Sequence, residues 1–243
     1  MTLRHIGGIA ALTCAGTYMF GFALLVTILA PLGFGSNDVD TAAVVEFTRA
    51  NQAVMVTWNT VIYIVNALAL VLLVVALAAR LKPVSPDWSV ITLAFGLIWC
   101  TLVLGAGMIA NVATEQTVAL AERDFSAAVQ TWETLHAVEL GLGGGNEIAG
   151  GVWIFCVSLA GLLHRAFGKI VIGLGLLTGV GGLLTILPPL GETAGVVFGL
   201  GAIAWFVAIG LALVFNRGGA GPERGSASDR QCNGDSGKVV PQA

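Results

Sequence analysis

Three long stretches without a charged residue constrain the fold of this chain most strongly. They are LALVLLVVALAA (68–79), ITLAFGLIWCTLVLGAGMIA (91–110) and FGLGAIAWFVAIGLALVF (198–215). A helix crosses the hydrocarbon core of a bilayer with about 20 predominantly apolar residues. The composition agrees, because 10% of the residues are charged and the mean hydropathy is +0.90, whereas soluble domains carry about 25% charged residues. The sequence therefore predicts an all-α, multi-pass integral membrane protein in contact with the lipid bilayer.

Apolar segments separated by polar turns predict six transmembrane helices. They cover residues 7–33, 55–80, 88–112, 140–163, 169–190 and 194–216. Together they form one transmembrane domain over residues 1–217. The remaining segment, 218–243, is rich in Gly, Ser and charged residues. It has little apolar surface to bury, so we expect a disordered tail.

The distribution of charge predicts how the chain is oriented. Two short turns are basic, ARLKPVSPDW (79–88) and HRAFGK (164–169), whereas the segments on the other side are acidic. Of the 11 Lys and Arg residues, only Arg49 and Arg123 fall on that acidic side. Basic residues near helix ends stay in the cytoplasm. We therefore expect both termini and the tail to be cytoplasmic, and the acidic segments to face outward.

The external segment near 114–138 differs from an ordinary loop. Val118, Phe125, Val129 and Trp132 recur at near-helical spacing within it. This pattern predicts an amphipathic helix that lies on the outer surface or leads directly into the fourth span. The segment 37–54 is expected to form a second helix of this kind.

The stretch HAVELGLGGGNEIAGGVWIF (136–155) places a carboxylate, Glu147, where the chain enters the membrane. Glu147 precedes His164, at the inner end of the span, by 17 residues. At ~1.5 Å per residue this is about 25 Å, which places Glu147 in the outer third of a core roughly 30 Å thick. A carboxylate in hydrocarbon costs several kcal/mol unless it faces protein or water. The neighbouring run Gly143–Gly145 has poor helix propensity and predicts a kink or close helix packing.

Other polar side chains gather in the same outer half, and they predict a pocket with Glu147 at its floor. Tyr63 and Asn66 share one face of the second span, Asn111 lies at the outer end of the third, and Asn146 precedes Glu147. Asn66 and Asn146 would then support a ligand or proton held by Glu147. The alternative is that these groups only hydrogen-bond neighbouring helices, and the sequence leaves both interpretations open.

The segment WETLHAVEL offers Glu133, His136 and Glu139 at successive steps of three residues. Carboxylate and imidazole at this spacing bind metal in di-iron bundles, which need the motif on two helices. This chain has one copy, so we assign no metal ligands and keep the three residues as candidates for acid–base chemistry. A solvated helix face with one histidine explains the pattern equally simply. The sequence identifies no cofactor and has no basic surface for nucleic acid.

The second half of the chain resembles a known family. The residues concerned are GGVWIFCVSLAGLLHRAFGKIVIGLGLLTGVGGLLTILPP (150–189) and AWFVAIGLALVF (204–215): a short basic turn, a Gly-rich span ending in prolines, and a last span with a Trp. This arrangement is similar to a family of six-span bacterial membrane proteins, domain of unknown function 4386. The resemblance implies six helices and a bacterial inner-membrane location. It implies no activity and no site residues.

Three functional hypotheses remain open at this stage. The first is binding or transport of a small molecule or proton through the outward-facing pocket, although the inner half of the membrane shows no polar pathway. The second is a membrane-embedded enzyme acting on a lipid-soluble substrate, with Glu147 or Glu139 as acid or base and His136 assisting. The third is a non-catalytic subunit or assembly factor whose Gly-lined faces dock another membrane protein or a second copy of this chain.

Overall fold

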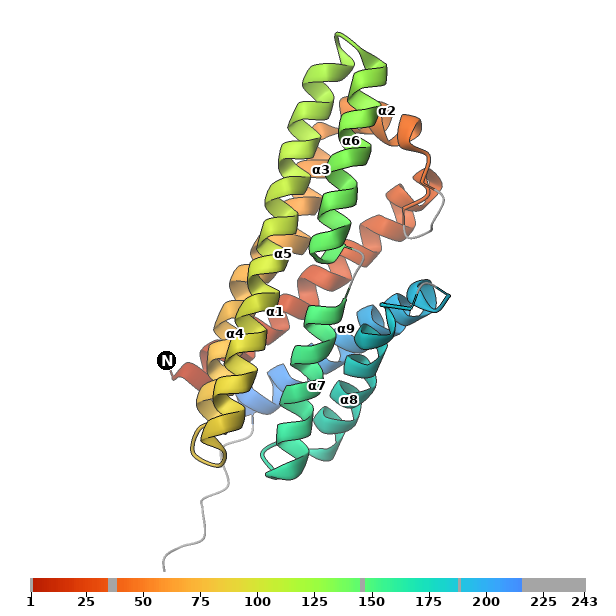
Figure 1. Cartoon of the computed structure of the whole chain (residues 1–243). Helices are drawn as coiled ribbons and strands as arrows, with labels where there is room; N and C mark the ends of the chain where they lie inside the picture. Colours follow the sequence, from red (N-terminus) through yellow and green to blue (C-terminus); the bar gives the residue numbers. More distant parts are fainter. Residues whose placement is uncertain (1, 35–38, 145–146, 188, 216–243) are drawn as a thin grey trace, which may run out of the picture.

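The computed structural model describes residues 2–34, 39–144, 147–187 and 189–215. Within these residues every regular element is helical (Figure 1). The predicted tail, 218–243, and Asn146 lie outside the described residues. In chain order the α-helices are α1 (Leu3–Leu24), α2 (Thr41–Ala50), α3 (Gln52–Asn59), α4 (Asn66–Leu81), α5 (Pro86–Ala121), α6 (Phe125–Glu139), α7 (Ile148–Leu163), α8 (Lys169–Leu184) and α9 (Gly191–Phe215). Three short π-helical stretches extend α1 (Leu25–Leu29), join α3 to α4 (Thr60–Val65) and follow α6 (Leu140–Gly144).

The long helix α5 runs through both halves of the molecule. It has 36 residues, which is about 54 Å at the α-helical rise, well beyond a bilayer core of about 30 Å. One half of α5 packs in a bundle with α1, α4, α7, α8 and α9, and the other half packs against α6, which returns alongside it (Figure 1). Helices α2 and α3 complete this second part.

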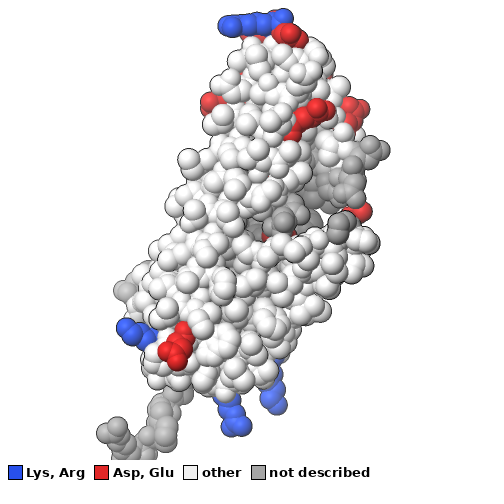
Figure 2. All heavy atoms as spheres, viewed as in Figure 1, with Lys and Arg blue, Asp and Glu red and all other residues white. Residues whose placement is uncertain are grey.

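Exposed apolar side chains indicate which part of the bundle faces lipid. On α5 they run from Val90 to Val112, a rise of about 33 Å. On α6 they resume only at Val138, apart from Phe125 at the first residue of that helix. Figure 2 shows charged side chains gathered toward the two ends of this face, with a largely uncharged band between them. The α5–α6 hairpin beyond Val112 therefore projects out of the apolar belt.

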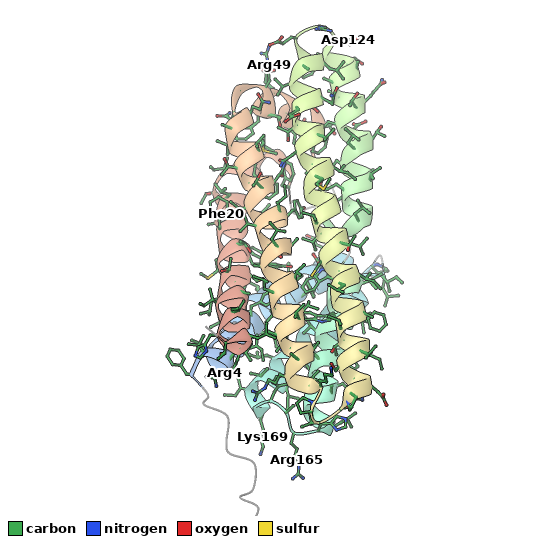
Figure 3. All side chains as sticks on the ribbon, turned by 90° about the vertical axis from the view of Figure 1, so that its left-hand side faces the viewer. Arg4, Phe20, Arg49, Asp124, Arg165 and Lys169 are labelled. Atoms are coloured by element: carbon green, nitrogen blue, oxygen red, sulfur yellow. The ribbon has the colours of Figure 1, made fainter. Side chains whose placement is uncertain are left out.

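Charge differs between the two ends of the molecule. Arg4, Arg165 and Lys169 lie at one end and Arg49 and Asp124 at the other (Figure 3). The first end also carries the basic turn at 79–88, and we call it the basic end. The other end carries the acidic segments predicted to lie outside, and we call it the acidic end.

Five helical stretches in the described part of the chain are long and apolar enough to cross a membrane. This suggests a multi-pass membrane protein. The predicted span 169–190 corresponds to α8, which is apolar but has 16 residues, about 24 Å in length. The sixth span and the cytoplasmic placement of both termini therefore stay predictions. The five stretches are Leu3–Leu32, Gln52–Leu81, Pro86–Ala121, Phe125–Leu163 and Gly191–Phe215.

The helices at the acidic end extend beyond the predicted spans. Helix α5 continues to Ala121, past the end of the predicted span at 112, and α6 packs against it. The external segment near 114–138 is the end of α5 together with α6, and α6 leads into the fourth span as one of the two alternatives stated. That span is broken, because Gly143 has φ 131° and ψ 11° before α7 begins at Ile148.

The core of the bundle is a layer of large aromatic side chains from three helices. Trp153 on α7 packs against Trp99 on α5 and Trp205 on α9, with ring centroids 5.5 Å apart in both pairs. Glycines make room for these rings: a Cβ on Gly96 would lie 2.6 Å from Trp153 Nε1, and one on Gly175 would lie 2.6 Å from Trp205 Nε1. At both positions a glycine allows close helix packing. The layer closes the centre of the bundle.

Candidate functional site

A hydrogen-bonded group of three side chains lies on the side of the apolar belt that faces the acidic end, which we call its acidic edge. Tyr63 donates its hydroxyl to Glu139 Oε1 at 2.5 Å, and the other carboxylate oxygen of Glu139 lies 2.8 Å from His136 Nδ1. Glu139 is buried, with 8% of its surface exposed. A buried carboxylate is stable only when it is well hydrogen-bonded or paired, and here each of its oxygens has a partner.

Two irregular helical turns position this group. Tyr63 lies in the π-helical stretch Thr60–Val65, and Glu139 is the last α-helical residue before the stretch Leu140–Gly144. A π-turn changes the register of the side chains that follow it and is frequent at functional sites. The hydrogen bond between Tyr63 and Glu139 therefore joins the two irregular turns.

Aromatic rings surround the imidazole of His136. The ring of Trp132 stacks on it at 4.3 Å between centroids, and Phe34 packs edge-on at 6.0 Å. An ionised carboxylate only accepts hydrogen bonds, so with Glu139 ionised Nδ1 of His136 is the donor and Nε2 is the nitrogen left for another partner. No described residue forms a hydrogen bond with Nε2. The histidine is therefore oriented by one neighbour and open at its other nitrogen.

Glu147 lies at the helix break, directly before α7. Its backbone N–H donates to Thr185 Oγ1 at 3.3 Å, and Thr185 in turn donates to the carbonyl of Gly182 at 2.6 Å. These bonds tie the break to the end of α8. The Glu147 carboxylate forms no hydrogen bond or ion pair within the described ranges, but it interacts electrostatically with Tyr18 and Tyr63.

One hydrogen bond and longer-range electrostatic interactions thus link four acidic or phenolic side chains near the break. Glu147 and Glu139 approach it from the fourth span, Tyr63 from the turn between α3 and α4, and Tyr18 from α1. Tyr18 and Tyr63 are the two tyrosines of the whole chain. Figure 2 shows the surface hollowed about halfway along the molecule, with acidic atoms visible inside. We use the name acidic recess for the region around these four side chains.

The predicted asparagines take part in contacts between helices. Asn66 donates to Thr17 Oγ1 on α1 at 2.7 Å and is 1% exposed, and Asn111 donates to Thr60 Oγ1 at 3.1 Å. Each bond joins two helices, as the packing interpretation expected. The structure thus brings Tyr63 to the carboxylates and gives Asn66 and Asn111 partners of their own.

The row Glu133, His136 and Glu139 is only partly brought together. His136 and Glu139 are in contact, whereas Glu133 is exposed on the side of α6. Among the residues that the structure describes, no group of three His, Cys, Asp or Glu side chains is placed to hold a metal ion. The pair is therefore a carboxylate–imidazole dyad.

Sequence reasoning missed Tyr18, Trp132 and Phe34 as members of this region. Trp132 was read only as part of an amphipathic pattern. Tyr18 could have been found, because a phenol in an apolar span is unusual and the chain has two tyrosines. Phe34 gives no signal before its place beside His136 is known.

No protein-family model, curated protein or solved structure matches the chain. The resemblance to the six-span bacterial family therefore stays a prediction.

Proposed function

We propose that this chain binds a small ligand in the acidic recess, and that the ligand is a cation, an amine or a proton. The observation that carries the proposal is the buried carboxylate of Glu139, hydrogen-bonded to Tyr63, together with a second carboxylate, Glu147, that interacts electrostatically with Tyr63 and Tyr18. An ionised carboxylate only accepts hydrogen bonds, and acidic groups inside a membrane mark ligand or proton sites. Glu147, whose carboxylate no described residue neutralises, is the primary ligand-binding group.

Binding from the acidic end is better supported than passage through the bundle. The layer of Trp99, Trp153 and Trp205 fills the centre of the bundle, and these rings are at most 2% exposed. A polar ligand would have to cross this layer to reach the basic end. Transport therefore requires a second conformation in which the rings separate.

Native mass spectrometry of the protein in mild detergent tests the proposal. The wild type is compared with Glu147→Gln and Glu139→Gln, and Glu133→Gln, which changes an exposed residue of α6, is the matched control. A bound small molecule in the wild type and the control that is absent from the other two variants supports the recess. The same adducts in all four proteins contradict it. A proton leaves no adduct, so proton uptake is followed with a pH dye in liposomes containing each protein.

The dyad of His136 and Glu139 favours one other function, an enzyme that acts on a lipid-soluble substrate. Glu139 orients the imidazole and Nε2 remains available, which is the arrangement of a general base. The test is to incubate the protein with a total lipid extract in nanodiscs and to compare lipid masses over time. A mass change that His136→Ala abolishes supports catalysis, whereas identical lipid profiles with and without protein exclude a reaction on those lipids.

We also propose that the protein lies in a bacterial inner membrane with its basic end in the cytoplasm. The charge difference between the two ends supports this orientation. The test starts from a variant without the native cysteines, into which Lys82→Cys or Asp124→Cys introduces a single cysteine. Each variant is labelled in intact cells with a membrane-impermeant thiol reagent. Labelling at position 124 but not at 82 is expected, and the reverse contradicts the orientation.

A further inference from the structure

A cavity of about 180 Å³ lies at the basic end, and its lining shares no residue with the acidic recess. Its walls come from three elements: Arg80 near the end of α4, the turn 166–168 between α7 and α8, and one face of α9. The residues of α9 are apolar and comprise Ile209, Ala212 and Leu213. Arg80 is the charged side chain of this lining.

The turn between α7 and α8 holds Arg80 in place. Its guanidinium donates from Nη2 to the carbonyl of Ala166 at 3.2 Å and lies over the ring of Phe167, 5.6 Å from the centroid. No carboxylate in the described part of the chain pairs with Arg80. Arg4 is close enough to repel it electrostatically. A guanidinium group in the cavity wall with no acid partner in the described residues favours an anion beside it.

Gly168, which lines the cavity, also suits an anion. Gly168 is the N-cap residue of α8, and no side chain caps this helix end. A Cβ built on Gly168 meets nothing within 4 Å. Backbone N–H groups at a helix N-terminus add to the attraction that Arg80 exerts on a negative charge.

Large apolar side chains around this end are exposed where acyl chains would lie. Leu163 is 58% exposed, Ile170 75% and Phe215 73%. Arg165 and Lys169 project from the same end (Figure 3). The basic end thus carries exposed basic and exposed apolar side chains together, which suits the headgroup region of a membrane.

We propose that this cavity binds a phosphate group through Arg80, and that an anionic phospholipid supplies it. Basic pockets between transmembrane helices bind such headgroups. Arg is suited to this because its planar group donates two parallel hydrogen bonds to a phosphate. Free phosphate ion shares the chemistry but makes no use of the apolar surface beside the cavity. The inference is independent of the acidic recess.

The test is native mass spectrometry of the full chain in detergent supplied with phosphatidylglycerol or phosphatidylcholine. Arg80→Gln removes the charge, and Gly168→Leu adds a large side chain to the cavity lining without changing any charge. Lys82→Gln is the matched control, because Lys82 is a basic residue of the same turn that does not line the cavity. We expect retention of phosphatidylglycerol to fall about fivefold or more in the first two variants and to be unchanged in the control, with no such difference for phosphatidylcholine.

A second arm identifies the source of the phosphate. Thermal unfolding is measured in sodium phosphate and in sodium chloride of equal ionic strength. A stabilisation by phosphate that Arg80→Gln removes, without lipid retention, assigns the cavity to free phosphate. Equal retention of phosphatidylglycerol by the wild type, Arg80→Gln and Gly168→Leu, with no effect of phosphate, overturns the proposal. If Arg80→Gln fails to fold, the Gly168→Leu variant alone tests the proposal, because a Cβ at this position meets no atom within 4 Å and the variant should fold.

Discussion

Tyr63 and Glu139, 76 residues apart in the chain, are joined by a hydrogen bond of 2.5 Å at the acidic edge of the apolar belt. The bond connects the second span to the fourth, and each residue lies at or beside a π-helical turn. The other carboxylate oxygen of Glu139 is hydrogen-bonded to Nδ1 of His136. A single carboxylate therefore fixes the relative positions of two spans and the orientation of one imidazole.

Replacing Tyr63 with Phe should destabilise the protein measurably, because it leaves one oxygen of the buried Glu139 carboxylate without its donor. Hydrogen bonds to charged groups contribute about 1.5–3 kcal/mol. Tyr18→Phe is the matched control, since no described residue hydrogen-bonds the hydroxyl of Tyr18, and it should cost less. Chemical unfolding in detergent gives both values. An equal loss of unfolding free energy in the two variants would show that the hydrogen bond to Glu139 does not stabilise the protein.

A double-mutant cycle separates this bond from the other contacts of Glu139. If the bond is the main link, Glu139→Gln and Tyr63→Phe should be non-additive, with a coupling energy of about 0.5–3 kcal/mol. His136→Ala combined with Tyr63→Phe provides the comparison, since those two residues touch the same carboxylate and not each other. Strict additivity in the first cycle would argue against a direct interaction.

The break in the fourth span should be sensitive to Gly143 and tolerant at Gly141. Gly143 has φ 131°, and a side chain in such a conformation costs about 1–3 kcal/mol. A Cβ at either position meets no atom within 4 Å, so the strain at Gly143 is in the backbone alone. Gly143→Ala should therefore lower stability or straighten the break, whereas Gly141→Ala should not. Hydrogen exchange of the amides at 140–151 distinguishes these outcomes, and identical exchange in both variants would contradict the argument.

The sequence predicted the fold class and most of the spans because apolar run length reports directly on lipid exposure. It did not predict how far α5 extends. Nothing in residues 113–121 marks a helix end, and their partner α6 becomes visible only in three dimensions. The break was one of the two alternatives that the glycine run predicted, since poor helix propensity acts locally. The bond from the Glu147 backbone to Thr185 joins distant segments, and the sequence gives no sign of it.

The candidate site was predicted in part for the same reason. Glu139 and His136 are three residues apart, so helical spacing alone indicates their contact. Tyr63 and Tyr18 reach the recess from other helices, and their approach depends on helix packing that the sequence does not specify. Asn66 shares a helix face with Tyr63, yet its amide bonds to Thr17 instead. Spacing along one helix says which residues share a face but not which neighbour that face meets.

Asn66 should matter more for stability than Asn111. Both donate to a threonine on another helix, but Asn66 is 1% exposed and its bond is 2.7 Å long, against 3.1 Å for Asn111. Interhelical hydrogen bonds in membranes contribute about 0.6–2 kcal/mol, so Asn66→Ala should fall toward the upper end of that range and Asn111→Ala toward the lower. Unfolding in detergent measures both. Thr17→Val removes the same bond from the other side and should match Asn66→Ala, and a negligible effect would contradict this account.

The strongest packing constraint that the structure imposes on α8 is at Gly175. A Cβ there would lie 1.9 Å from Ser158 Oγ and 2.6 Å from Trp205 Nε1. Both neighbours belong to the closed core, where overpacking typically costs about 1–3 kcal/mol. Gly175→Ala should therefore destabilise the bundle and separate α8 from α7 and α9. The unfolding free energy in detergent measures the loss.

Gly173, two residues earlier on the same helix, provides the control for this prediction. A Cβ on Gly173 meets nothing within 4 Å, so Gly173→Ala should be neutral or stabilising by up to about 1 kcal/mol through helix propensity. Ser158→Ala removes the closer of the two atoms that Gly175→Ala would meet, so it should partly restore the stability of that variant. If both glycine variants behave alike, α8 does not pack against α7 and α9 as closely as the structure shows. If Ser158→Ala restores nothing, the contact with Trp205 alone accounts for the loss.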